Sequence, residues 1–224
     1  MKDEDIEKAA RRLQRRIYKD PEMQERWDKG LLTVADMVDP QNACRILGID
    51  YQEHPEFDSA FTGRPVAGLL DRQQKLIAVA TKYPGPVVRF TAAHELGHWV
   101  LHPQEIMHRD GPIESQSGAR NGRSREEREA DYFAACFLMP SKSILWEFQR
   151  RFGTELPLRL NEDTAFWLNP RDPDALICAD AWKEALVLAG TRQFDRYTFP
   201  SMAECFKVSR IQRRSATPSL SANA

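Results

Sequence analysis

The sequence predicts an α+β fold in which a small antiparallel sheet packs on two helices, followed by a mostly helical C-terminal region. Three observations lead to this prediction. A segment that ends at His102 has a helical pattern and contains His94-Glu95-Leu96-Gly97-His98. Two short runs typical of strands precede this segment, and a second helical pattern follows it at Ser124–Pro140.

The N-terminal part is expected to be helical. Residues 3–19 are rich in charge, and their apolar positions recur on one helix stripe: Ile6, Ala10, Leu13 and Ile17. Nearby acidic residues balance the arginine pairs of this segment, which favours a solvated helix face over a nucleic-acid contact. Asp39 and Pro40 supply an N-cap and a first-turn residue for a further helix that ends at Gly48.

The predicted strands lie before the histidine-bearing helix. Val66–Leu70 and Lys75–Thr81 flank a hairpin turn, and a strand at Gly48–Gln52 completes the antiparallel sheet. The long polar connection His102–Arg123 is expected to be either a functional loop or a tolerated surface insertion.

The H-E-x-x-H pattern carries the chemistry. His94 and His98 are one turn apart on one helix face, so both imidazoles can reach a single zinc ion at about 2.0–2.1 Å. Glu95 projects beside the metal, where its carboxylate can take a proton from the attacking water. The spacing therefore predicts a zinc site for hydrolysis of peptide bonds, with Glu95 as the general base.

A third ligand must come from elsewhere, because catalytic zinc usually has three protein ligands. A histidine two turns further on is excluded, since Leu101 and Gln104 occupy the required glycine and histidine positions. His102 lies about 12 Å from His94 along the helix axis. We interpret His102 as a helix C-terminal residue that faces the helix dipole.

The later helix offers glutamates for this role. Its apolar face consists of Ala130, Phe133, Ala134, Phe137 and Leu138. One turn back along that face lie Glu126 and Glu127. We favour Glu127 as the ligand, with Glu126 and Glu129 as alternatives, because Ser124 and Glu127 also match a capping box. Glu129 is expected to face solvent, and Asp131 could accept the free N–H of a ligating histidine.

Two motifs together resemble the ImmA/IrrE family of zinc metallo-endopeptidases: H-E-L-G-H at residues 94–98, and E-x-E-A-D-x-F-A-x-x-x-L-M-P at residues 127–140. The resemblance extends over Val38–Pro140 and implies a gluzincin-like fold. It implies these roles: zinc ligands His94, His98 and Glu127, with general base Glu95. Family members commonly have Asn at the position of Asp131, and either side chain can accept from a histidine. The resemblance also implies a regulatory protease that cleaves a helix-turn-helix repressor inside the cell.

Composition sets further limits. The chain has 224 residues, of which 42% are hydrophobic and 29% charged, as expected for a soluble globular protein. A net charge of −1 gives no electrostatic case for binding nucleic acid or a membrane. No signal peptide or membrane-spanning stretch is apparent, so a cytoplasmic protein is expected. The four cysteines are scattered without a C-x-x-C pair, which argues against a cysteine zinc site or a disulfide framework.

We predict this domain organisation: an N-terminal charged helix at 1–30, a zinc metallopeptidase domain at 31–150, a helical C-terminal region at 151–214 and a disordered tail at 215–224. Ile144–Phe148, at the end of the predicted peptidase domain, and Asp174–Leu188 are expected to be helical, and residues 153–174 irregular. Ser201–Arg214 resembles a helix-turn-helix with several arginines.

The leading hypothesis is a zinc-dependent endopeptidase with a protein substrate. The alternative is a non-catalytic, zinc-containing regulator that binds DNA or a transcription factor through its C-terminal helices. Direct DNA binding is not expected, because the second predicted helix of Ser201–Arg214 is short. An aminopeptidase is a third hypothesis, but no residue to anchor a substrate N-terminus can be identified.

Overall fold

A computed structural model of the chain describes residues 1–57, 66–110, 124–153, 161–178, 187–194 and 197–208. These residues form two compact units. The first is Met1–Pro140 together with Val208, and the second is Ser141–Lys207. Within the described residues, no helix is both long and apolar enough to cross a membrane. The predicted α+β class is confirmed.

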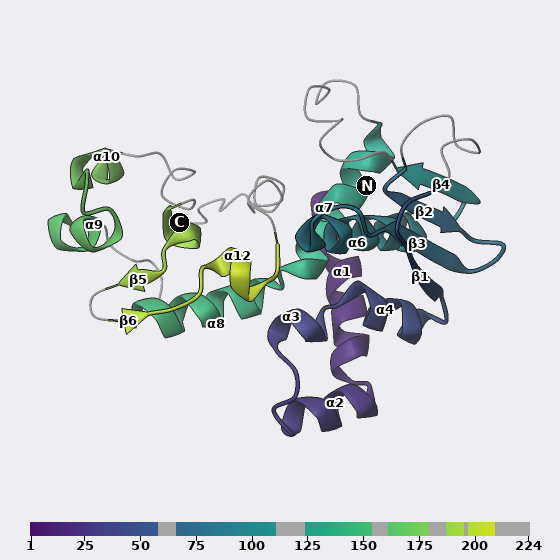
Figure 1. Cartoon of the computed structure of the whole chain (residues 1–224), viewed down its shortest axis with the longest axis horizontal. Helices are drawn as coiled ribbons and strands as arrows, with labels where there is room; N and C mark the ends of the chain where they lie inside the picture. Colours follow the sequence, from purple (N-terminus) through teal and green to yellow (C-terminus); the bar gives the residue numbers. More distant parts are fainter. Residues whose placement is uncertain (58–65, 111–123, 154–160, 179–186, 195–196, 209–224) are drawn as a thin grey trace. The chain divides into compact units, whose positions relative to one another are not determined.

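The first unit contains a four-stranded sheet in the order β1-β3-β2-β4 (Figure 1). Its strands are β1 (Asp50–His54), β2 (Gly68–Asp71), β3 (Leu76–Ala80) and β4 (Met107–Asp110). β2 pairs antiparallel with β3 and β4, whereas β1 pairs parallel with β3. The prediction of a purely antiparallel sheet is therefore wrong. Strand β4, which lies within the predicted loop His102–Arg123, pairs with the edge of β2 that faces away from β3. Strand β1 pairs with the outer edge of β3.

Four helices precede the sheet: α1 (Asp3–Tyr18), α2 (Pro21–Asp28), α3 (Val34–Met37) and α4 (Pro40–Leu47). The predicted apolar stripe of α1 is buried, and α1 packs against α7 (Arg125–Leu138). Gln14 of α1 donates hydrogen bonds to the carbonyls of Cys136 and Phe137, at 2.8 and 3.0 Å. These bonds satisfy acceptors that a helix C-terminus otherwise leaves open. α4 begins at the Asp39 cap and ends at left-handed Gly48, as predicted.

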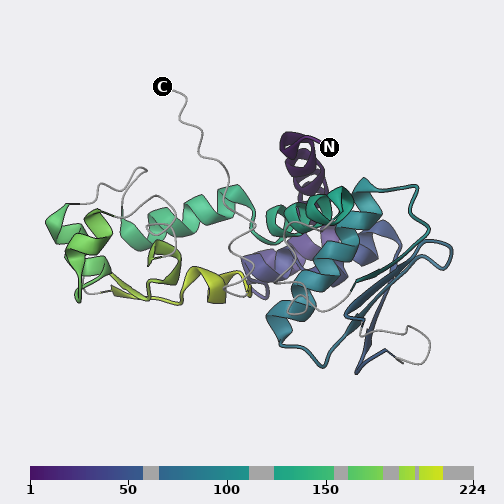
Figure 2. The same ribbon diagram turned by 90° about the horizontal axis from the view of Figure 1, so that it is seen from above.

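Helix α6 (Gly85–Leu101) is the centre of the first unit. Every residue from Arg89 to His98 is buried, because α6 packs against β2 and β3 as well as against α7. Figure 2 shows α6 and α7 side by side, with the strands on one side of them. Because α6 is buried on several sides, its apolar residues are not confined to one stripe, and its buried polar residues belong to the site described below.

Helices α6 and α7 meet at a close contact between Gly97 and Ala130. A Cβ atom added to Gly97 would lie 3.0 Å from both the Cα and the carbonyl oxygen of Ala130. These are backbone atoms, so they cannot move aside without shifting a whole helix. The glycine of the H-E-L-G-H motif therefore sets the distance between the two helices.

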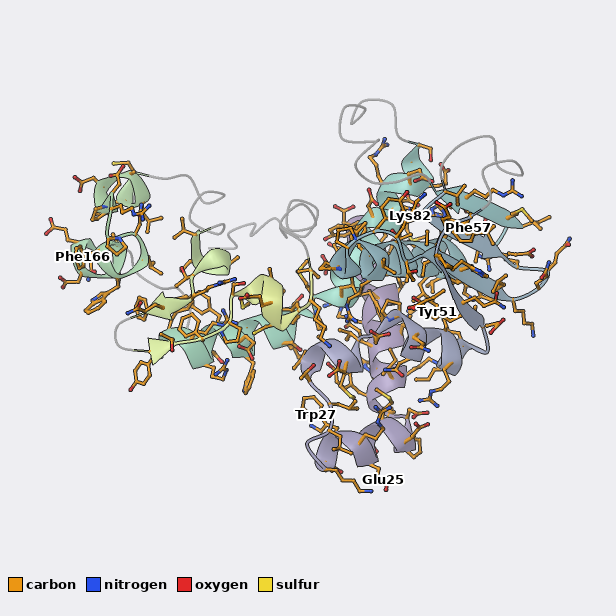
Figure 3. The ribbon with its side chains drawn as sticks, viewed as in Figure 1. Glu25, Trp27, Tyr51, Phe57, Lys82 and Phe166 are labelled. Atoms are coloured by element: carbon orange, nitrogen blue, oxygen red, sulfur yellow. The ribbon has the colours of Figure 1, made fainter. Side chains whose placement is uncertain are left out.

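The second unit contains α8 (Ser141–Phe152), α9 (Glu162–Leu168), α10 (Pro173–Ile177), the ribbon β5 (Gln193–Phe194) with β6 (Tyr197–Thr198), and α12 (Met202–Cys205). Its core is formed by Phe152, Ala165, Leu168 and Leu176. Phe166 points away from this core on the exposed side of α9 (Figure 3).

Helix α9 corrects the prediction of irregular structure at residues 153–174. Asn161 and Thr164 form a reciprocal capping box at its start, a signal that the many Pro and Asp residues of this stretch obscured. The predicted helix Asp174–Leu188 includes residues 179–186, which lie outside the described residues. The same holds for residues 209–214 of the predicted helix-turn-helix and for the predicted disordered tail. The predicted domain boundaries stay predictions.

We expect Gly97→Ala to lower the free energy of unfolding by about 1–3 kcal/mol, because the added methyl group overpacks the α6–α7 contact. Gly85→Ala is the matched control, since it lies in the same helix and a Cβ there meets nothing within 4 Å. Urea unfolding of both variants measures the difference. Equal stability of the two would contradict the close contact.

Candidate metal centre

Helix α6 presents the two histidines of the motif side by side in the interior. His94 and His98 are 1% and 0% exposed, and their Nε2 atoms are 3.0 Å apart. One helical turn separates the two residues, so their rings come from the same face of α6. Glu95, between them in sequence, is fully buried.

Helix α7 brings Glu127 to these two nitrogens. Glu127 Oε2 lies 3.5 Å from His94 Nε2, and Oε1 lies 3.5 Å from His98 Nε2. The capping box is only half formed: Ser124 Oγ accepts from the backbone N–H of Glu127, while the Glu127 side chain turns to the histidines. Of the two alternatives, Glu126 is exposed, and Glu129 contacts His102 instead.

The three side chains suit a tetrahedral cation. Donors held at about 2.0–2.1 Å by tetrahedral zinc lie about 3.3 Å from one another. The separations of 3.0, 3.5 and 3.5 Å between the Nε2 and carboxylate atoms agree with that value. Two imidazoles and one carboxylate are also a common donor set for catalytic zinc. His94, His98 and Glu127 therefore fit a zinc ion.

Carboxylates fix the outer nitrogens of both rings. His94 Nδ1 lies 3.0 Å from Asp131 Oδ1, and His98 Nδ1 lies 2.7 Å from Glu105 Oε2. A ring that donates its Nδ1–H to a carboxylate keeps its Nε2 lone pair for a metal. Asp131 was singled out from the sequence for this role, whereas Glu105 was not.

Glu105 and His108 are site residues that the sequence reasoning missed. Glu105 Oε1 lies 2.9 Å from His108 Nδ1, and His108 Nε2 lies 3.2 Å from Glu127 Oε1. Ligand-type atoms of His94, His98, His108 and Glu127 all lie within 4.8 Å of one another. Both missed residues follow α6, where no helical spacing relates them to the motif. The only available signal was a second carboxylate and histidine close behind H-E-x-x-H.

His102 belongs to the support of the site. It caps α6, as predicted, and its Nε2 lies 3.1 Å from Glu129 Oε2. Glu129 is only 12% exposed and also accepts from Arg125, so the prediction that it faces solvent is wrong. His98, His102 and Glu105 form a second possible metal-binding cluster. A metal there would need His98 Nδ1 as a ligand, and this nitrogen already contacts Glu105. The cluster is therefore no independent second site.

Arg72, in the β2–β3 turn, holds the C-terminal end of α6. Its guanidinium donates to the carbonyls of His98 and Trp99, both at 2.8 Å, and of His102 at 3.0 Å. Its Nε also donates to the Glu105 carbonyl at 2.6 Å. A cation at this end is favourable, because the last carbonyls of a helix carry partial negative charge. Arg72 thus joins the sheet to the backbone of His98, one of the candidate ligands.

The electrostatics of the cluster match a site built for a cation. Burial alone would raise the pKa of Glu127, but His108, His94 and His98 hold that pKa far below its usual range. Burial lowers the pKa of His98. Burial also acts to lower the pKa of His108, but contact with Glu127 and the charge of Glu95 raise it to about 9. The Glu127 carboxylate is thus ionised at neutral pH.

Glu95 lies against the sheet at a residue without a side chain. A Cβ atom added to Gly68 of β2 would lie 2.5 Å from Glu95 Oε1 and 2.6 Å from Thr91 Cγ2. Gly68 therefore leaves the space that the Glu95 carboxylate occupies. The sequence did not single out Gly68, because this contact joins two elements far apart in the chain.

A buried histidine pair, a carboxylate from a second helix and a glutamate beside them define a metallopeptidase-type site. The chain belongs to the IrrE N-terminal-like domain (Peptidase_M78) family, whose model matches residues 45–164. The resemblance seen in the two motifs is thereby confirmed. No curated protein matches the chain.

We expect Glu127→Gln to weaken zinc binding, because it removes a charged ligand. The loss should exceed the roughly 10–100-fold that follows when a residue hydrogen-bonded to a ligand is removed. Glu126→Gln is the matched control, since it removes the neighbouring, exposed carboxylate and should leave zinc affinity unchanged. Competition with a chromophoric chelator measures both. Equal affinity of the two variants would remove Glu127 from the ligand set.

Proposed function

We propose that the protein is a zinc-dependent endopeptidase. One observation carries the proposal: the Nε2 atoms of His94 and His98 lie 3.0 Å apart, and each lies 3.5 Å from one carboxylate oxygen of Glu127, close to the separations of donors around a tetrahedral zinc. The buried Glu95 lies next in sequence to one of these ligands, where a hydrolase needs its base. Membership of a metallopeptidase family supports the same conclusion.

The residues would share the work as follows. A bound zinc ion supplies Lewis-acid polarisation of the scissile carbonyl and of the attacking water. Glu95 takes the proton of that water and afterwards delivers it to the leaving amine. His94, His98 and Glu127 would hold the metal, and Asp131 would orient the His94 ring. Burial of Glu95 keeps bulk water from competing for its proton.

For the substrate, we propose a helix-turn-helix transcriptional repressor in the cytoplasm. The support is the likeness to the ImmA/IrrE family, in which regulatory proteases of this kind occur. The substrate would be cut at an internal peptide bond, as the likeness to the ImmA/IrrE endopeptidases suggests. A repressor encoded beside the gene for this protein is the first substrate to test.

We expect Glu95→Gln to keep zinc affinity while cleavage of that repressor falls at least about 100-fold, because general-base catalysis is lost. Mass spectrometry of the products measures cleavage, and chelator competition measures the metal. A wild-type chain that binds zinc but cuts neither the repressor nor a mixed peptide library would reject the peptidase. Unchanged cleavage by Glu95→Gln would reject the assigned base.

Gly68→Ala should lower kcat roughly 100-fold, because its methyl group would displace the Glu95 carboxylate by about 1 Å. Zinc affinity should remain at the wild-type value, since Gly68 contacts Glu95 and Thr91 rather than a proposed ligand. Gly85→Ala again serves as the control. A fully active Gly68→Ala would show that Glu95 is not held by this contact.

A further inference from the structure

A continuous series of polar contacts links two proposed ligands on different helices. His98 Nδ1 of α6 lies 2.7 Å from Glu105 Oε2, and Glu105 Oε1 lies 2.9 Å from His108 Nδ1. His108 Nε2 of β4 then lies 3.2 Å from Glu127 Oε1 of α7. One carboxylate therefore orients two imidazoles, and the second of them touches the ligand of the opposite helix.

The geometry of the His108 ring separates it from the ligands. Two imidazoles that radiate from one tetrahedral zinc have ring centroids about 5 Å apart. His94 and His98 fit this, with centroids 4.8 Å apart and planes at 62°. His108 is instead stacked on His98, with centroids 3.8 Å apart and planes at 20°. Its ring thus runs beside His98 towards the Glu127 carboxylate.

Backbone hydrogen bonds hold the two middle residues of this series, Glu105 and His108, in place. The Glu105 carbonyl accepts from Arg72 Nε, and the Ile106 carbonyl accepts from the Arg72 backbone N–H at 3.0 Å. His108 lies opposite Leu70 in the β2–β4 ladder. The side chain of Glu105 is 27% exposed and that of His108 is 13% exposed, so water competes only in part for their contacts. The series therefore rests on the sheet and does not depend on a freely moving loop.

We propose that Glu105 and His108 are positioning residues of the metal centre, which fix His98 and Glu127 relative to each other. We call the series His98–Glu105–His108–Glu127 the ligand relay. Ligand atoms on two separate helices can otherwise drift apart in the absence of the metal. The relay connects them through β4, so that a zinc ion meets donors already in place and less ordering accompanies binding.

The relay makes a specific prediction about zinc affinity of the full chain. Glu105→Ala and His108→Ala should each weaken zinc binding about 10–100-fold, the usual effect of losing an outer-shell partner. The double variant should be weakened little more than either single variant, because both substitutions break the same connection. Glu105→Gln, which keeps one acceptor oxygen, should fall between the wild type and Glu105→Ala. If Glu105→Ala does not fold, Glu105→Gln takes its place in the comparison of single and double variants.

Chelator competition on these variants is the test, with His54→Ala as the matched control. His54 is an exposed strand histidine of β1 outside the cluster. Urea unfolding of each metal-free variant checks that it is folded, and a purely structural role would make zinc affinity fall only in parallel with the urea midpoint. Zinc affinity of His108→Ala equal to that of His54→Ala would overturn the proposal. So would a double variant whose loss is the product of the two single losses.

Cobalt substitution tests the non-ligand assignment of His108. The visible spectrum of the cobalt-loaded His108→Ala variant should retain the wild-type band positions and intensity, because the ligand set is unchanged. A change in band positions or intensity relative to the wild type would make His108 a ligand and overturn the relay.

This inference rests on the proposed metal centre, but its readouts need no substrate. A relay that holds in a protein without cleavage activity would reject only the peptidase. A wild-type chain that does not bind zinc would reject both proposals.

Discussion

The contact between Gly97 and Ala130 is the constraint on which the site depends. It permits α6 and α7 to approach at backbone distance, with 3.0 Å between an ideal Cβ at position 97 and two backbone atoms of Ala130. Glu127 lies one turn before Ala130 on α7, and His94 and His98 flank Gly97 on α6. At a wider separation, the carboxylate of Glu127 would no longer reach both imidazoles. The metal-binding geometry is therefore a consequence of helix packing.

The close approach also concentrates charge in the interior, and the structure compensates for it locally. Burying a carboxylate or an imidazolium costs several kcal/mol unless partners are present. Each buried imidazole of the site has a carboxylate at its outer nitrogen, and Glu127 faces three histidines. Arg72 meets the carbonyls at the end of α6 in the same way. The imidazoles of His94 and His98 and the carboxylate of Glu127 thus each have a partner of complementary charge or hydrogen-bonding type.

The sequence was informative where a structural relation is local. Helical spacing placed His94 and His98 on one face, and Glu127 with Asp131 on another, because residues four apart on a helix always share a side. Capping residues located α4 and the start of α7 for the same reason. The parallel pairing of β1, the strand β4 and the contacts of Glu105 and His108 depend on segments distant in the chain. No periodicity within one segment encodes them.

Gly68 shows why the remaining information is hard to read from one sequence. A glycine in a strand interior suggests only that another group approaches the backbone closely, without saying which group it is. Here the group is the Glu95 carboxylate, from a helix that begins after the next strand. Strand β2 therefore contributes to the site in three ways. One edge pairs with β3, which follows the turn that contains Arg72, and the other edge pairs with β4, which carries His108. On its face, Gly68 lies against Glu95. The proposed active site is assembled around this one short strand, and its ligands lie on the two helices that the strand and its neighbours position.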